Sequence, residues 1–210
     1  FLRTRNEAQL AAVLGHEYTH YAHRHSLRSF RDVKSKAGMA AFMSAVPIVS
    51  YGAGAIASIV QTGLIGSIYA FSRDMEREAD AGSIPLLERA GYDPGAASRV
   101  WDQVLRESDA TAAARKRRKS AARRQLDFYD SHPTSQERLD TLRQLAASKS
   151  GVLERDSYRQ ALAPFWGDFI DDQIKLNDFG ASDFLITSAA SEGWSGALYY
   201  ARAELFRTRG

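Results

Sequence analysis

The sequence predicts a mainly α-helical protein, and three observations support this fold class. An apolar, helix-forming run from Ala11 to His20 ends in the motif HExxH. A second segment, from Ser72 to Asp80, places carboxylates at helical spacing. Helix start and stop signals then recur along the chain, and no good strand candidate precedes the first helix.

The first predicted helix begins after Asn6, a suitable N-cap, and extends to about Arg31. Within it, His16 and His20 are four residues apart and therefore share one face, where two imidazole nitrogens can reach one metal ion. Glu17 lies one step around the helix, where a carboxylate can accept a proton from water. This spacing predicts the core of a zinc hydrolase.

The alternative is a chance HExxH on a solvated helix, with both histidines as surface groups. Leu10, Val13 and Leu14 would instead turn one side of this helix toward a core. Burying two histidines and a carboxylate costs free energy unless they are paired or bind a metal ion. The apolar setting of the motif therefore favours a metal site.

A third ligand must be His, Asp or Glu, because the chain has no cysteine. The longer pattern HExxHxxGxxH would need Gly at position 23 and His at position 26, but the chain has His23 and Ser26. We expect His23 and His25 to be solvated groups at the end of the helix.

The segment after Ser72 offers a better third ligand. Glu76 and Asp80 are four residues apart on a second predicted helix, so Glu76 could bind zinc while Asp80 accepts a hydrogen bond from the far nitrogen of a ligand histidine. Glu78 points elsewhere and is expected to be an ordinary solvated residue. On spacing alone, a charged helical surface explains the segment equally well.

Residues 37–72 contain no charged side chain, which invites the prediction of a membrane span. Several glycines and hydroxyl side chains interrupt the stretch, so two small buried helices or a helical lid near the site fit better. Membrane contact stays open.

The helix that carries Glu76 should end near Ala90, because Gly91 can adopt the left-handed conformation. Asp93 then caps a helix that has Pro94 at its first position and reaches about Arg106.

Thr134 and Glu137 form a capping-box pair for a helix through about Ala147, and residues 148–151 are expected to be a linker. We therefore divide the chain into a catalytic domain of residues 1–147 and a C-terminal helical region of residues 152–210. In that region we expect helices over residues 158–176, 181–190 and 194–209. The last one weakly resembles the first helix of a tetratricopeptide repeat, and amphipathic helices packed on the catalytic domain are the favoured alternative.

The net charge of +3 is too small to imply a nucleic-acid partner. The sharpest basic cluster, at positions 115–119 with Arg123 and Arg124, could bind phosphate backbones or anionic lipid. No aromatic side chains interleave it, so a solvated helix or loop is favoured and nucleic acid is not an expected partner.

Four ordered motifs carry a family resemblance. The first is the segment of residues 6–17, which leads into HExxH at 16–20, and the second is the pattern SRxxExEADxxG at 72–82. The third is Ala-Gly-Tyr-Asp-Pro at 90–94, and the fourth is Ser-His-Pro at 131–133, followed by Arg-Leu at 138–139. Together they resemble peptidase family M48, which holds the CAAX prenyl endopeptidases, the HtpX-like heat-shock peptidases and the BepA-like periplasmic peptidases.

The resemblance implies a zincin-type fold of the gluzincin class with one Zn²⁺ per chain. It assigns zinc to His16, His20 and Glu76 and the general base to Glu17. It also places Asp80 and Arg138 behind the ligands, with Asp80 supporting a ligand histidine. It also brings His132 into the site, either to stabilise the oxyanion, with Arg138 near it, or to act as a fourth zinc ligand in a resting state.

The expected substrates are proteins or peptides. Such peptidases hold a substrate along the edge of a small sheet, and because no strand candidate precedes the first helix we expect the edge strands to lie upstream of Phe1. The resemblance further implies a place in the bacterial cell envelope, periplasmic and soluble or membrane-associated, with quality control of misfolded or misassembled envelope proteins as the function. The alternative is a chaperone-like or scaffold protein with little or gated proteolysis, which binds envelope-assembly partners through its C-terminal helices.

Overall fold

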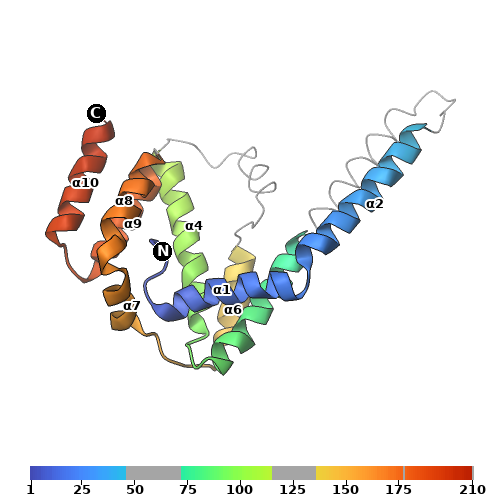
Figure 1. Ribbon diagram of the computed structural model, residues 1–210, viewed down its shortest axis with the longest axis horizontal. Coiled ribbons are helices and arrows are strands. Elements are labelled where there is room, and N and C mark those ends of the chain that lie inside the picture. Colours follow the sequence, from blue (N-terminus) through green and yellow to red (C-terminus); the bar gives the residue numbers. More distant parts are fainter. Residues whose placement is uncertain (46–71, 115–135, 177, 210) are drawn as a thin grey trace.

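The computed structural model describes residues 1–45, 72–114, 136–176 and 178–209, and it confirms a mainly helical protein (Figure 1). Within these ranges there is no β-strand, and one isolated bridge pairs Tyr92 with Val152. The helices are, in order, α1 (Glu7–Ala22), α2 (His25–Ala45), an unlabelled helix of residues 72–89, α4 (Gly95–Ala114), α6 (Gln136–Ala146), α7 (Arg155–Leu162), α8 (Trp166–Lys175), α9 (Phe179–Ala189) and α10 (Gly196–Arg209).

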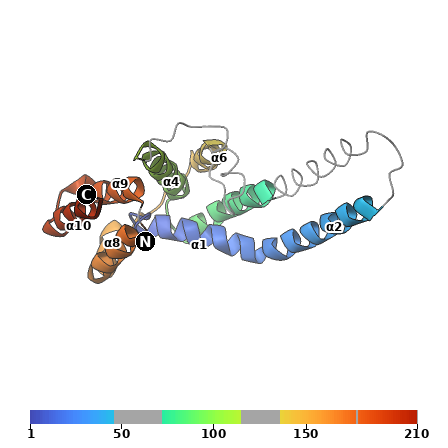
Figure 2. The same cartoon turned by 90° about the horizontal axis from the view of Figure 1, so that it is seen from above.

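Helix α1 begins as predicted but ends earlier. The Asn6 side chain accepts a hydrogen bond from the backbone N–H of Gln9, which satisfies an otherwise unpaired donor at the helix start. The helix stops at Ala22 rather than near Arg31, because Arg24 adopts a left-handed backbone conformation with φ 53°. The chain then restarts as α2, which extends away from the other helices (Figures 1 and 2).

The helix of residues 72–89 lies very close to α1. A β-carbon at Gly82 would come within 2.5 Å of the Thr19 side chain, so only glycine permits this separation. The Thr19 hydroxyl donates back to the Gly15 carbonyl, and the Ser83 hydroxyl donates to the Asp80 carbonyl. These small residues let the two helices bring their polar side chains to one point.

The end of that helix follows the prediction. Gly91 has φ 79°, and the backbone N–H groups of Gly91 and Tyr92 donate to the carbonyls of Glu88 and Leu87, which is the Schellman arrangement. Asp93 then accepts from the Gly95 backbone N–H as α4 begins. Helix α4 is longer than predicted and reaches Ala114 instead of Arg106.

Two apolar clusters support the fold. The first lies beneath α1 and joins four helices through Ala12, Ile84, Leu87, Ala97 and Leu142. The second joins the C-terminal helices to the start of the chain through Leu2, Ile170, Leu185, Ile186, Ala201 and Leu205. Helix α4 connects the two clusters. It packs against α1 and α6, which contribute to the first cluster, and against α9, which contributes to the second.

The residues directly after the predicted linker are held by backbone hydrogen bonds. Val152 exchanges hydrogen bonds with Gly91 and Asp93, and the carbonyls of Leu153 and Glu154 accept from the first turn of α1. After these residues, the helix expected over residues 158–176 is interrupted by a 3₁₀ turn, Ala163–Phe165, that contains Pro164. The later expectations agree more closely with α9 and α10.

Several predictions fall outside the described residues. They concern most of the uncharged stretch, the basic cluster at 115–124, His132 and the Thr134 cap. Among the helices that are described, none combines the length and the apolar character needed to cross a bilayer.

Candidate metal centre

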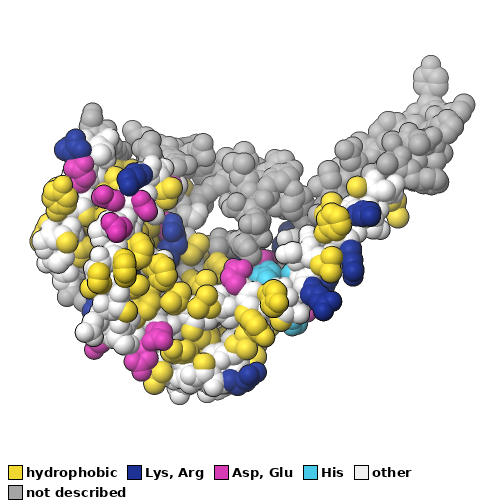
Figure 3. Space-filling model, in the orientation of Figure 1, with side chains coloured by type: hydrophobic (Ala, Val, Ile, Leu, Met, Phe, Trp, Pro, Cys, Tyr) yellow, Lys and Arg dark blue, Asp and Glu magenta, His cyan; other side chains and the backbone are white. Residues whose placement is uncertain are grey.

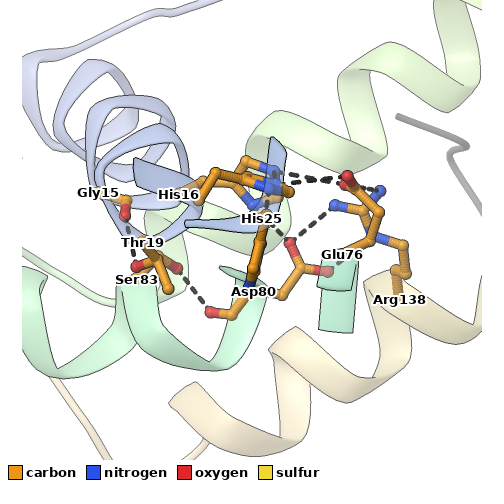
Figure 4. Close-up of polar contacts among 9 residues, drawn as sticks. Gly15, His16, Thr19, His25, Glu76, Asp80, Ser83 and Arg138 are labelled. Atoms are coloured by element: carbon orange, nitrogen blue, oxygen red, sulfur yellow. Dashed lines mark hydrogen bonds and ion pairs between the residues drawn. The ribbon is translucent and has the colours of Figure 1, made fainter. Parts of the chain in front are cut away.

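The structure brings three predicted ligands to one point. His16 and His20 lie on α1, and Glu76 lies on the neighbouring helix. In Figure 4 the side chains of His16 and Glu76 point toward one another. The Nε2 atoms of the two histidines are 3.0 Å apart. A Glu76 carboxylate oxygen lies 3.4 Å from His16 Nε2, and the other lies 3.3 Å from His20 Nε2. His16 and Glu76 are buried, and His20 is partly exposed.

These separations fit a tetrahedral zinc ion. Zinc lies about 2.0–2.2 Å from imidazole nitrogen or carboxylate oxygen, so two of its ligands at a tetrahedral angle are about 3.3 Å apart. The three observed separations lie around that value, and the donor set is the one that zinc favours in open, catalytic sites.

Asp80 and Arg138 support this centre from the interior. His16 Nδ1 lies 3.1 Å from Asp80 Oδ1, so the far nitrogen of this histidine faces a carboxylate. Arg138 donates to both Asp80 oxygens at 2.7 and 2.8 Å and also lies 2.9 Å from Glu76. Its guanidinium stacks over the Trp101 ring at 4.4 Å. Arg138 thus bridges the two carboxylates from behind the metal centre.

The charges of this buried group shift the pKa values of His16 and Asp80. Burial alone would lower the pKa of His16, but hydrogen bonds to Asp80 and Glu76 outweigh burial and raise the pKa to about 9. Burial would raise the pKa of Asp80, but donation by Arg138 and contact with His16 lower it. The contacts with Arg138 and His16 therefore favour the ionised form of Asp80, which can accept a hydrogen bond from His16.

A second set of side chains lies on the outer side of His20. His25 Nδ1 is 2.8 Å from His20 Nδ1, and His25 Nε2 is 3.1 Å from a carboxylate oxygen of Glu78. Glu78 also contacts Arg28 at 2.7 Å and His23 at 2.5 Å. Donation by Arg28, opposed by burial and assisted by both histidines, lowers the pKa of Glu78 to about 2.

This outer set corrects two expectations. His23 is exposed as predicted, but His25 is only 2% exposed, because the break between α1 and α2 turns it back beneath His20. Glu78 is not a separate solvated residue, since it contacts three basic side chains. Neither contact could be found from spacing, because each depends on the path of the chain after Ala22.

Glu17 borders the small cavity beside the metal centre. This cavity is lined by Ala12, Val13, His16, Glu17, Asp80, Ser83, Ala97, Val100 and Trp101. The Glu17 side chain is exposed while its neighbour His16 is buried, so the carboxylate can meet water at the edge of the centre. Figure 3 shows histidine side chains at the surface of the molecule, with an acidic side chain beside them.

A family model and several known proteins match this chain. The family model described as "Peptidase family M48" matches residues 1–146. The mitochondrial metalloendopeptidase OMA1 of Saccharomyces cerevisiae is 26% identical over 71% of this chain and 40% of its own length. OMA1 of Schizosaccharomyces pombe is 31% identical over 64% of this chain and 35% of its own.

The beta-barrel assembly-enhancing protease of Escherichia coli K12 is 29% identical over 48% of this chain and 22% of its own length. The chain thus spans less than half the length of each of these relatives. No solved structure matches the chain.

Proposed function

This chain belongs to peptidase family M48, and we propose that it is a zinc-dependent endopeptidase that hydrolyses peptide bonds. The observation that carries the proposal is the set of separations of 3.0 to 3.4 Å among His16, His20 and Glu76, which one tetrahedral zinc ion would satisfy. Held by these residues, zinc would supply a Lewis acid that polarises the scissile carbonyl and lowers the pKa of water.

We assign the proton transfers to Glu17. Its exposed carboxylate borders the cavity beside His16, so it can accept a proton from the attacking water and pass that proton to the leaving amine. Asp80 holds the proton of His16 on Nδ1, which leaves the Nε2 lone pair free to bind zinc. Arg138 holds Asp80 and Glu76 in place.

His132 has two proposed roles. In one it donates a hydrogen bond to the oxyanion of the tetrahedral intermediate, and in the other it binds zinc as a fourth ligand and keeps the enzyme inactive at rest. Arg138 is occupied by two carboxylates, so in this proposal His132 acts on the oxyanion without it.

The finer proposal concerns the setting. Similarity to the beta-barrel assembly-enhancing protease supports a function in quality control of misfolded or misassembled envelope proteins. We propose that the protein acts in the periplasm, either as a soluble or as a membrane-associated protein. We place the peptidase unit in residues 1–147. The helices of residues 152–210, the last of which is weakly tetratricopeptide-like, would contact an assembly partner.

Glu17→Gln tests the peptidase proposal. We expect it to reduce cleavage of casein by about 10²–10⁴-fold while its zinc content stays at one per chain. Glu88→Gln, an exposed carboxylate paired with Lys149 near the far end of the helix that carries Glu76, is the matched control and should cleave like the unaltered protein. Equal cleavage by Glu17→Gln would refute the proposal.

A second measurement separates the chaperone-like alternative. If the Glu17→Gln protein still rescues an envelope-assembly defect as well as the unaltered protein does, binding rather than hydrolysis is the function.

The zinc content of Glu76→Ala tests the third ligand. Retention of stoichiometric zinc in this variant would contradict the assignment of Glu76.

A further inference from the structure

His25 and Glu78 form a chain of contacts that ends on a candidate zinc ligand. His20 faces the metal centre through Nε2, and its other nitrogen, Nδ1, lies 2.8 Å from His25 Nδ1. His25 Nε2 in turn lies 3.1 Å from Glu78 Oε2. Figure 4 shows His25 beside the centre. The contacts therefore run from the surface carboxylate through two imidazole rings to the ligand atom.

The break between the first two helices creates this chain. In a continuous helix, His25 would lie about 140° around the axis from His20, so the two rings would point apart. Left-handed Arg24 instead turns the backbone, and α2 restarts at His25 with its ring against His20 at a centroid distance of 4.7 Å. His25 is 2% exposed, so water does not replace this contact.

The positions of the protons follow from the partners. A histidine that binds zinc through Nε2 carries its proton on Nδ1, so His20 must donate and His25 Nδ1 must accept. The proton of neutral His25 is then on Nε2, where it meets the Glu78 carboxylate, which can only accept. One arrangement of protons satisfies all three residues, and it orients the lone pair of His20 toward the centre.

We propose that His25 is a positioning residue for the metal ligand His20, and that Glu78 sets the tautomer of both histidines. His25 thus does for His20 what Asp80 does for His16, with one imidazole inserted between the ligand and the carboxylate. The inference rests on the proposed zinc site and deepens it by assigning two residues that spacing had placed in solvent.

A rival use of the same side chains is a second metal site, because His23, His25 and Glu78 could also surround an ion. Two observations oppose it. Arg28 already lies 2.7 Å from Glu78 and adds a positive charge. A metal ion on His25 Nε2 would also move the proton of His25 to Nδ1, where it would face the proton of His20 across 2.8 Å.

The test measures zinc affinity, by competition with a chromophoric chelator, and not proteolysis. We expect His25→Leu, which keeps bulk but removes the acceptor, to weaken zinc binding about 10- to 100-fold. His25→Asn, whose side-chain oxygen can take the place of Nδ1, should recover most of the loss. The matched control is His23→Ala, which removes a contact to Glu78 but none to His20, and it should bind zinc within about twofold of the unaltered protein.

Three results would overturn the proposal. The first is unchanged zinc affinity in a His25→Leu protein whose metal-free circular dichroism and urea midpoint match those of the unaltered protein. The second is an equal loss in His25→Leu and His25→Asn. The third is a second zinc equivalent that both His23→Ala and His25→Leu remove. A chain that binds zinc as proposed but does not cleave casein would refute the peptidase function and leave this inference intact.

Discussion

The two histidines of the metal centre are supported in opposite ways. His16 contacts Asp80 directly, and Arg138, which lies over the Trp101 ring, donates to Asp80. Asp80 and Arg138 are both buried. His20 contacts Glu78 only through His25, and Glu78 with its partner Arg28 is partly exposed. The support of His16, on the inner side, relies on charged groups that are shielded from water. The support of His20, on the outer side, relies on the buried imidazole of His25, which separates His20 from the partly exposed Glu78. Loss of a charge should therefore cost far more inside than outside.

The largest expected effect is on the inner side. Arg138→Met leaves Asp80 and Glu76 as two buried carboxylates without their shared cation, which should cost about 3–5 kcal/mol in the free energy of unfolding. Urea unfolding of the metal-free protein measures it. Arg77→Met removes an exposed arginine that bridges Asp74 and Glu137 and should cost less than about 1 kcal/mol. Similar losses of unfolding free energy in Arg138→Met and Arg77→Met would show that burial does not make the Arg138 contacts more important than the Arg77 ones.

The pH dependence of stability is the next effect. Since contacts with Asp80 and Glu76 raise the pKa of His16 to about 9 against burial, His16 stabilises the metal-free fold fully below its unfolded pKa of 6.5 and loses this contribution as the pH rises through 9. We expect a loss of about 3 kcal/mol across that window, measured by urea unfolding in the presence of a chelator. Asp80→Asn should flatten the curve. A flat curve in the unaltered protein would mean that His16 is neutral throughout.

The approach of the two helices gives a smaller effect. Gly82→Ala places a methyl group 2.5 Å from the Thr19 side chain, so the helices must separate, at a cost of about 1–3 kcal/mol, and Glu76 should move away from the histidines. Thermal unfolding and zinc affinity should both fall. The double variant with Thr19→Ala makes room for the methyl group and should recover part of both. No recovery would locate the damage elsewhere.

The smallest effect is expected at the outer charge. Arg28→Gln removes a cation whose side chain is 41% exposed, so the free energy of unfolding should change by less than about 1 kcal/mol. Zinc affinity should change little, because Glu78 keeps its contacts with both His23 and His25. A loss as large as that of Arg138→Met would mean that the outer side is as tightly coupled as the inner one.

Local signals in the sequence were sufficient for much of the fold. Asn6 and Gly91 mark helix ends because each satisfies backbone groups within a few residues of itself. The end of α1 was missed because nothing in the composition of residues 22–25 requires a break, and the left-handed Arg24 is retained by contacts made after folding. The end of α4 was placed too early for a similar reason, since α9 packs against this helix.

The sequence by itself determined which residues share a helical face, namely His16 with His20 and Glu76 with Asp80, because the α-helical repeat fixes spacing over four residues. Only the tertiary structure decided that these two faces meet, that Arg138 bridges both carboxylates, and that His25 and Glu78 stand behind His20. The physical reason is range. A helical repeat is set by local backbone geometry, whereas the direction of a chain after a break and the distance between two helices depend on all the side chains packed between them.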